Sequence, residues 1–182
     1  MLFRLCAISV AKSYVIIIGV INLKIVTYFL SPAEYGLIGL FGITQSLLGL
    51  AVVAPCGNFL NRYTIEWYQK NLLKQKLSYL NTILLVASLI GACVVTLLYL
   101  RYLNVNMSIM YAIVFVINFY ATTWISTFSS IITSLGYQEL SSKGTLITYT
   151  LSSVCAISSI LFIDKSPLIW IAGQTSGFFI GY

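Results

Sequence analysis

The chain has 182 residues, of which 59% are apolar and only 8% are charged. A globular chain is about 25% charged and about 45–50% apolar, so this composition excludes an ordinary soluble domain. The formal net charge is +6, but no basic stripe or aromatic RNA-binding motif accompanies it, so we expect no nucleic-acid partner. The apolar residues form long runs between short charged segments, a pattern typical of membrane-spanning segments.

Six apolar runs predict an all-α integral membrane protein, a bundle of about six transmembrane helices. Each complete run has about 20 residues or more, enough to cross a ~30 Å hydrocarbon core. The first run follows basic residues but no small-residue cleavage site comes after it, which favours an uncleaved helix over a signal peptide. The last run is still apolar at Tyr182, so we expect a fragment of a longer protein. The expected spans are 10–30, 35–54, 77–100, 108–134, 144–163 and 168–182, the last of them truncated.

The most polar stretch, residues 58–76, separates the second and third expected spans. Cations alternate there with aromatic rings, a mixture typical of a helical segment at the level of the lipid headgroups. We therefore predict a cytoplasmic basic and aromatic interfacial segment. Its charged and aromatic residues include Arg62, Tyr63, Glu66, Trp67, Tyr68, Lys70, Lys74 and Lys76.

The distribution of cations predicts the orientation of the chain. If the N-terminus is cytoplasmic, seven of the ten lysines and arginines lie on the inner side, which is the side that cations favour. Lys24, Arg101 and Lys165 then lie on the outer side. The inner cations are Arg4, Lys12, Arg62, Lys70, Lys74, Lys76 and Lys143.

No pattern for covalent chemistry occurs in the sequence. The chain has no histidine, which excludes the usual zinc sites and the Ser-His-Asp triad. It also has no P-loop, nucleophile elbow or dinucleotide-binding glycine turn. We therefore expect no enzyme, no cofactor and no metal. The cysteines form no CxxC pair and are predicted to be small buried apolar residues; they are Cys6, Cys56, Cys93 and Cys155.

A cation inside the first span is the sharpest candidate for a binding site, because intramembrane charges mark functional positions. Lys24 lies about two turns before the Ser31-Pro32 stop, ~10 Å below the interface by helical rise. It is predicted to hold an anionic head group such as a pyrophosphate. Tyr28, four residues later on the same helix face, would line the same site. The alternative is a lysine that reaches the outer headgroups by snorkelling.

Two further groups of polar residues are candidates for substrate binding. Arg62, after the second span, is predicted to neutralise a lipid phosphate entering from the cytoplasm; its alternative is ordinary positive-inside anchoring. Asn118 and Thr122 belong to a serine-, threonine- and asparagine-rich face of the fourth span. That face is suited to sugar hydroxyls, and it is equally typical of hydrogen bonding between helices.

The first third of the chain resembles the polysaccharide flippases of the O-antigen translocase type. In that family a first span ends in a turn with the pattern L-(G/S)-P-x-x-(Y/F)-G, and the second span is followed by a glycine, an arginine and an acid. The inner loop at 134–144 also resembles the loop after the family's fourth span. The matching residues are Leu30, Ser31, Pro32, Tyr35, Gly36, Gly57, Arg62 and Glu66.

This resemblance implies a fold, an activity and partners. Family members have two six-helix lobes around a central cavity, so the chain would correspond to the N-terminal lobe of a 6+6 transporter. They move undecaprenyl-pyrophosphate-linked oligosaccharide across the bacterial inner membrane by alternating access. The implied partners are this lipid-linked oligosaccharide, membrane lipids, a missing C-terminal lobe and the polysaccharide polymerase machinery.

Two other functions fit the same sequence. One is a small-molecule or multidrug exporter of the same superfamily, which would differ in the lining of the cavity. Cationic drugs favour acidic cavity residues, whereas the candidate charges here are basic. The other is a non-transporting membrane assembly factor, for which a short chain would be natural.

Overall fold

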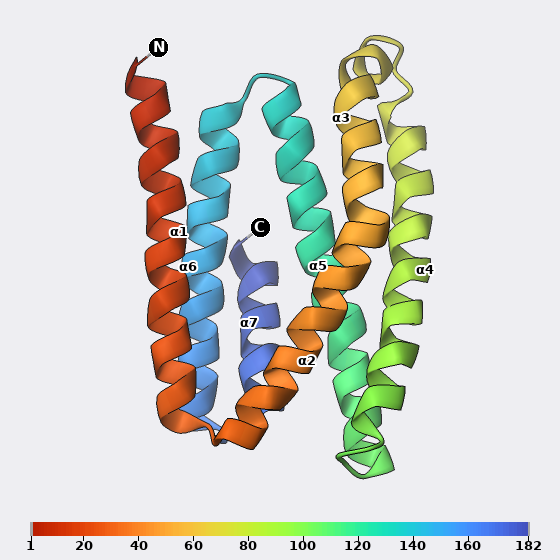
Figure 1. Cartoon of the computed structure of the whole chain (residues 1–182). Coiled ribbons are helices and arrows are strands. Elements are labelled where there is room, and N and C mark those ends of the chain that lie inside the picture. Colours follow the sequence, from red (N-terminus) through yellow and green to blue (C-terminus); the bar gives the residue numbers. More distant parts are fainter. Residues whose placement is uncertain (1, 182) are drawn as a thin grey trace. The chain divides into compact units, whose positions relative to one another are not determined.

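The chain folds into helices joined by short turns. The computed structural model describes residues 2–181, and their side chains from Ser13 to Gly181. Within this range the secondary structure is helical and contains no strand, which confirms the expected all-α class. The elements in Figure 1 are α1 (Leu2–Phe29), α2 (Pro32–Leu48), the π-helical segment η1 (Gly49–Val53), α3 (Ala54–Gln69), α4 (Leu73–Tyr99), α5 (Val105–Ser134), α6 (Gln138–Phe162) and α7 (Pro167–Gly181).

Several of these helices are long and apolar enough to cross a bilayer. Four segments of the described chain meet this criterion by length and composition. They are Pro32–Gln69, Leu73–Tyr99, Val105–Ser134 and Gln138–Phe162. Because a lipid-exposed backbone must satisfy its own hydrogen bonds, helices of this length and composition make the chain a multi-pass membrane protein.

The second helix is longer than the sequence pattern indicates. The expected span ends at residue 54, just before Pro55, but α2, η1 and α3 form one continuous helical segment of 38 residues. Proline lacks an N–H and clashes inside a regular α-helix. Here Pro55 sits in the first turn of α3, directly after the π-helical turn that loosens the hydrogen-bond ladder. The helix therefore continues through Pro55.

The expected interfacial segment 58–76 is divided between two helices. Residues 58–69 belong to α3, residues 70–72 form a turn, and 73–76 open α4. The turn contains Asn71 with a φ of 57°, the left-handed conformation that asparagine tolerates better than most residues. The segment is thus a helical hairpin tip, and its depth relative to the headgroups stays a prediction.

The Ser31-Pro32 turn is a helix start with a clear local cause. The Ser31 hydroxyl and backbone N–H both donate to Oε2 of Glu34, each at 2.8 Å, and the Glu34 N–H lies 3.4 Å from the Ser31 hydroxyl. This reciprocal arrangement is a capping box, and Pro32 at the first helical position has a backbone angle already suited to it. A structural role therefore accounts for Ser31, Pro32 and Glu34.

The chain divides into two compact units, and the two boundaries fall within α2 and in the turn between α5 and α6. Unit 1 comprises Met1–Gly39 and Tyr137–Tyr182, and unit 2 comprises Leu40–Gly136. In unit 1, α1 packs on α6, where Asn22 Nδ2 donates to the Ser153 hydroxyl at 2.8 Å. In unit 2, α4 and α5 are antiparallel neighbours, and α3 packs on both.

The closest helix contact in unit 1 is made by small residues. Gly173, Gly177 and Gly181 recur every four residues along α7. Cβ atoms at these positions would lie 2.3 to 2.8 Å from backbone atoms of α6. The α6 atoms concerned are the Cα atoms of Ala156, Ser152 and Thr148, which have the same spacing. Such small-residue faces let membrane helices approach closely.

The core of unit 2 combines leucines with aromatic rings. Leu60 of α3 and two leucines of α4, Leu80 and Leu84, form a buried cluster against which Tyr120 and Trp124 of α5 pack. Nearer the opposite ends of α4 and α5, buried rings of α2 and α5 pack together, with centroid separations of 5.0 and 5.6 Å. These rings belong to Phe41, Phe115 and Phe119.

Candidate functional site

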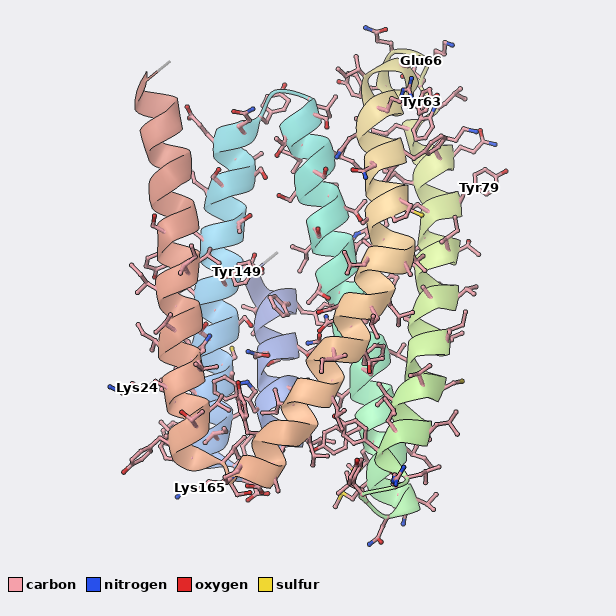
Figure 2. All side chains as sticks on the ribbon, viewed as in Figure 1. Lys24, Tyr63, Glu66, Tyr79, Tyr149 and Lys165 are labelled. Carbon is pink, nitrogen blue, oxygen red and sulfur yellow. The ribbon has the colours of Figure 1, made fainter. Side chains whose placement is uncertain are left out.

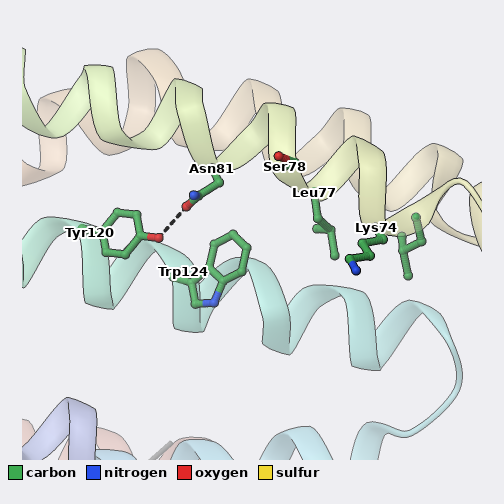
Figure 3. Close-up of a pocket in the computed structure, with 7 residues that line it drawn as sticks. Lys74, Leu77, Ser78, Asn81, Tyr120 and Trp124 are labelled. Carbon is green, nitrogen blue, oxygen red and sulfur yellow. Dashed lines mark hydrogen bonds between the residues drawn. The ribbon is translucent and has the colours of Figure 1, made fainter.

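A groove between α4 and α5 brings together charged, polar and aromatic side chains of unit 2 (Figure 3). Its volume is about 460 Å³. This is within the range of about 300–1,000 Å³ found for ligand pockets in proteins. The lining residues are Leu73, Lys74, Leu77, Ser78, Asn81, Tyr120 and Trp124. We refer to it as the α4–α5 groove.

Helical spacing explains why these side chains share one groove. Lys74, Ser78 and Asn81 are four and three residues apart, so they follow one face of α4. Tyr120 and Trp124 are four residues apart on α5, and their rings are stacked at a centroid distance of 6.4 Å with an interplanar angle of 7°. The antiparallel pairing of α4 with α5 brings the two faces together.

One hydrogen bond fixes the middle of the groove. The Tyr120 hydroxyl donates to Oδ1 of Asn81, as the dashed line in Figure 3 shows. Because this bond uses the carbonyl oxygen of the Asn81 amide, the two N–H donors of that amide are not involved in it. The groove therefore offers amide and hydroxyl groups beside a flat aromatic surface.

The charge of the groove is positive. Lys74 is the ionised side chain among its lining residues, and it is exposed. The acid in the neighbouring part of α3, Glu66, is paired instead with Lys70 at 2.6 Å. A lysine ammonium group is a suitable partner for phosphate oxygens. The groove can therefore accept an anionic group next to a ligand that combines hydroxyls with apolar faces.

The predicted residues Asn118 and Thr122 form a second polar site, deeper in unit 2. Both accept hydrogen bonds from Gln45 of α2, whose Nε2 donates to Asn118 Oδ1 at 3.1 Å and to the Thr122 hydroxyl at 2.9 Å. The Thr122 hydroxyl in turn lies 2.8 Å from the Asn118 carbonyl oxygen. These contacts match the alternative interpretation, in which the polar face of this span bonds one helix to another.

Replacing Gln45 by leucine is expected to destabilise unit 2. The change removes two interhelical hydrogen bonds, each worth about 0.6 kcal/mol and at most about 1.7 kcal/mol in membrane proteins. We expect the free energy of unfolding in detergent, measured by chemical denaturation, to fall by about 1–2 kcal/mol. Ser46→Leu, on the exposed face of the same helix, is the control. Equal stability of the two variants would contradict the role of Gln45.

The other predicted site residues lie on exposed helix faces. In unit 1, Lys24 is exposed and points away from α6 in Figure 2, while Tyr28, on the same face, has 83% of its surface exposed. This placement agrees with the snorkelling alternative for Lys24, and its role in a cavity stays a prediction. In unit 2, Arg62 is exposed on α3 with its guanidinium carbon 5.9 Å from the centroid of the Tyr63 ring.

The predicted cysteine environments are partly corrected. Cys93 is exposed on α4, because it belongs to the outer face of an apolar helix rather than to a helix contact. Cys56 and Cys155 are half-buried, and all three are free thiols. The side chains of Cys6, Arg4 and Lys12 lie outside the described residues.

The residues that the sequence interpretation missed are Gln45, Asn81, Tyr120 and the α7 glycines. A polar amide within an apolar run is a signal for Gln45 and Asn81, since such residues are costly in a membrane unless they have partners. The regular spacing of Gly173, Gly177 and Gly181 is a signal for close helix packing. No local pattern indicates that Tyr120 bonds to Asn81, because the two residues lie on different helices.

Comparison with known proteins adds no family assignment. No protein-family model, no curated protein and no solved structure matches the chain.

Proposed function

We propose that this chain is part of a transporter that moves undecaprenyl-pyrophosphate-linked oligosaccharide across the bacterial inner membrane by alternating access. The observation that carries the proposal is the α4–α5 groove, in which a cation, polar groups and stacked rings meet on a membrane helix bundle. A lipid-linked oligosaccharide presents matching chemistry: phosphates, hydroxyls and the apolar faces of sugar rings.

Each kind of side chain in the groove has a separate task in this proposal. Lys74 neutralises the pyrophosphate. Asn81 and Ser78 bond to sugar hydroxyls. The Trp124 ring covers an apolar face of a sugar, since an indole combines a large apolar surface with a polar edge. The polyprenyl chain stays in the surrounding lipid.

The orientation in this proposal follows the positive-inside rule. Among the described residues of unit 2, Arg62, Lys70 and Lys74 belong to the tip of the α3–α4 hairpin or adjoin it, whereas Arg101 follows the opposite end of α4. The hairpin tip would face the cytoplasm, together with the N-terminus. The groove would then load substrate from the cytoplasmic leaflet, where the lipid-linked sugar is made.

Complementation tests the proposed function. This chain, and separately a longer form extended through any reading frame that continues from it, would be expressed in a strain that lacks its own O-antigen translocase. We expect surface polysaccharide to return with the longer form, since the resemblance implies that a second lobe completes the cavity. Failure of both forms despite normal membrane insertion would contradict the flippase assignment.

An exporter of small molecules is the second candidate. The lining of the α4–α5 groove includes no carboxylate, which disfavours the cationic compounds that multidrug exporters carry. An increase in the efflux of dye cations on expression would favour this candidate. A membrane assembly factor would be favoured instead if substitutions in the α4–α5 groove left the level of surface polysaccharide unchanged.

A further inference from the structure

A second groove lies on the other side of α4, against α3. Its volume is about 410 Å³, and most of its lining is apolar. No side chain of the α4–α5 groove lines it, and all of its residues belong to unit 2. We refer to it as the α3–α4 groove. The lining residues are Pro55, Cys56, Phe59, Leu60, Trp67, Lys76, Tyr79, Leu80 and Ile83.

One end of the α3–α4 groove carries a cation between two aromatic rings. Lys76 Nζ lies 6.0 Å from the centroid of the Trp67 ring and 5.9 Å from that of the Tyr79 ring. Figure 2 shows Tyr79 with Tyr63 and Glu66 toward the end of unit 2 where α3 meets α4. Tryptophan and tyrosine with lysine are typical of the depth at which a bilayer changes from headgroups to acyl chains.

The charge around this end favours an anion. The hairpin tip has four cations and one acid within residues 62–76, a local balance of +3. The acid, Glu66, is paired with Lys70 rather than with Lys76. Basic clusters of this kind at a membrane surface attract anionic lipids in preference to zwitterionic ones.

The other end of the groove is apolar and lies deeper along the helices. Ile83 is seven residues beyond Lys76 on α4, which corresponds to about 10 Å along the helix axis. Pro55 and Cys56 of α3 also line this part of the groove, and Phe59 lies between the two ends, with its ring centroid 5.6 Å from that of Trp67. The groove therefore changes from cationic and aromatic to purely apolar along its length, which is the polarity profile of a phospholipid.

We propose that the α3–α4 groove binds one anionic phospholipid. Lys76 contacts the phosphate, Trp67 and Tyr79 flank the glycerol region, and one acyl chain lies along Phe59, Leu80 and Ile83. The bound lipid fills the space beside the buried leucine cluster at which α3 and α4 pack together. This site depends on the membrane fold alone and not on the proposed transport function.

Native mass spectrometry of the purified full chain tests the site. The chain would be released from nanodiscs that contain phosphatidylglycerol and phosphatidylcholine with identical acyl chains. We expect one phosphatidylglycerol to be retained preferentially. Lys76→Gln should lower that preference about fivefold, as expected for one cation near a membrane surface. Lys70→Gln removes the same charge from the same hairpin tip outside the groove and should have a smaller effect.

Two further measurements distinguish binding in the α3–α4 groove from general electrostatic attraction of anionic lipids to the hairpin tip. Ile83→Trp fills the apolar end without changing the charge and should abolish retention of the lipid. Glycerol 3-phosphate at millimolar concentration should not displace it, because the acyl chain supplies most of the contact. Equal effects of Lys76→Gln and Lys70→Gln, unchanged retention in Ile83→Trp, or displacement by glycerol 3-phosphate would each overturn the proposal.

Discussion

Gly177→Leu is expected to separate α7 from α6 and to leave unit 1 without a stable fold in detergent. A Cβ atom at position 177 would lie 2.3 Å from the Cα of Ser152 and 2.6 Å from its backbone nitrogen. These are backbone atoms, so no side-chain rotation relieves the clash. Overpacking of this kind costs about 1–3 kcal/mol even for small additions. A leucine adds three further carbon atoms to the same contact.

Gly177→Ala gives the same test on a measurable scale. We expect it to lower the free energy of unfolding by about 1–3 kcal/mol, measured by denaturant titration in detergent. Gly144→Ala is the matched control, because Gly144 lies in α6 and a Cβ there meets no atom within 4 Å. Alanine exceeds glycine in helix propensity by about 1 kcal/mol, so this control should be neutral or stabilising. A loss of stability of the same size in both variants would contradict the close contact of α6 with α7.

Under the proposed function, Trp124→Ala is expected to abolish transport by the form of the protein that restores surface polysaccharide. Truncating an aromatic side chain at the centre of a binding site costs about 2 kcal/mol or more, which weakens binding about 30-fold. Lys74→Gln should weaken binding about tenfold or more, because it removes a charge-assisted contact to phosphate. Surface polysaccharide would be measured at matched levels of membrane expression.

Ile117→Ala is the control for these groove substitutions. Ile117 lies on α5 like Trp124 and Tyr120, but it is exposed and does not line the groove. We expect normal surface polysaccharide in this variant. Full activity of both Trp124→Ala and Lys74→Gln would remove the α4–α5 groove from the transport path.

The helical class of the chain could be predicted because it depends on local composition. An apolar run of about 20 residues has few alternatives to a membrane helix. The end of the second span could not be predicted from Pro55, because a π-helical turn precedes the proline and the helix continues through it. The turn before α2 could be predicted because it depends on a local capping box made by Ser31 and Glu34.

The candidate site was only partly predictable. Asn118 and Thr122 stand out in the sequence as polar residues in an apolar run, but their partner Gln45 is more than 70 residues away. The Asn81–Tyr120 bond has the same origin, since only helix pairing brings the two side chains together. Sequence position gives the depth of Lys24 along its helix. The packing of α1 on α6 determines which way the helix face that carries Lys24 points.

Photocrosslinking tests most directly the proposal that the α4–α5 groove holds a lipid-linked oligosaccharide. A photoreactive amino acid would replace Trp124 in one version of the protein and Ile117 in another. Both would be illuminated in membranes that contain radiolabelled undecaprenyl-pyrophosphate oligosaccharide. We predict labelling from position 124 that excess unlabelled oligosaccharide-lipid suppresses, and little labelling from position 117. Equal labelling from the two positions, or none from position 124, would contradict the claim.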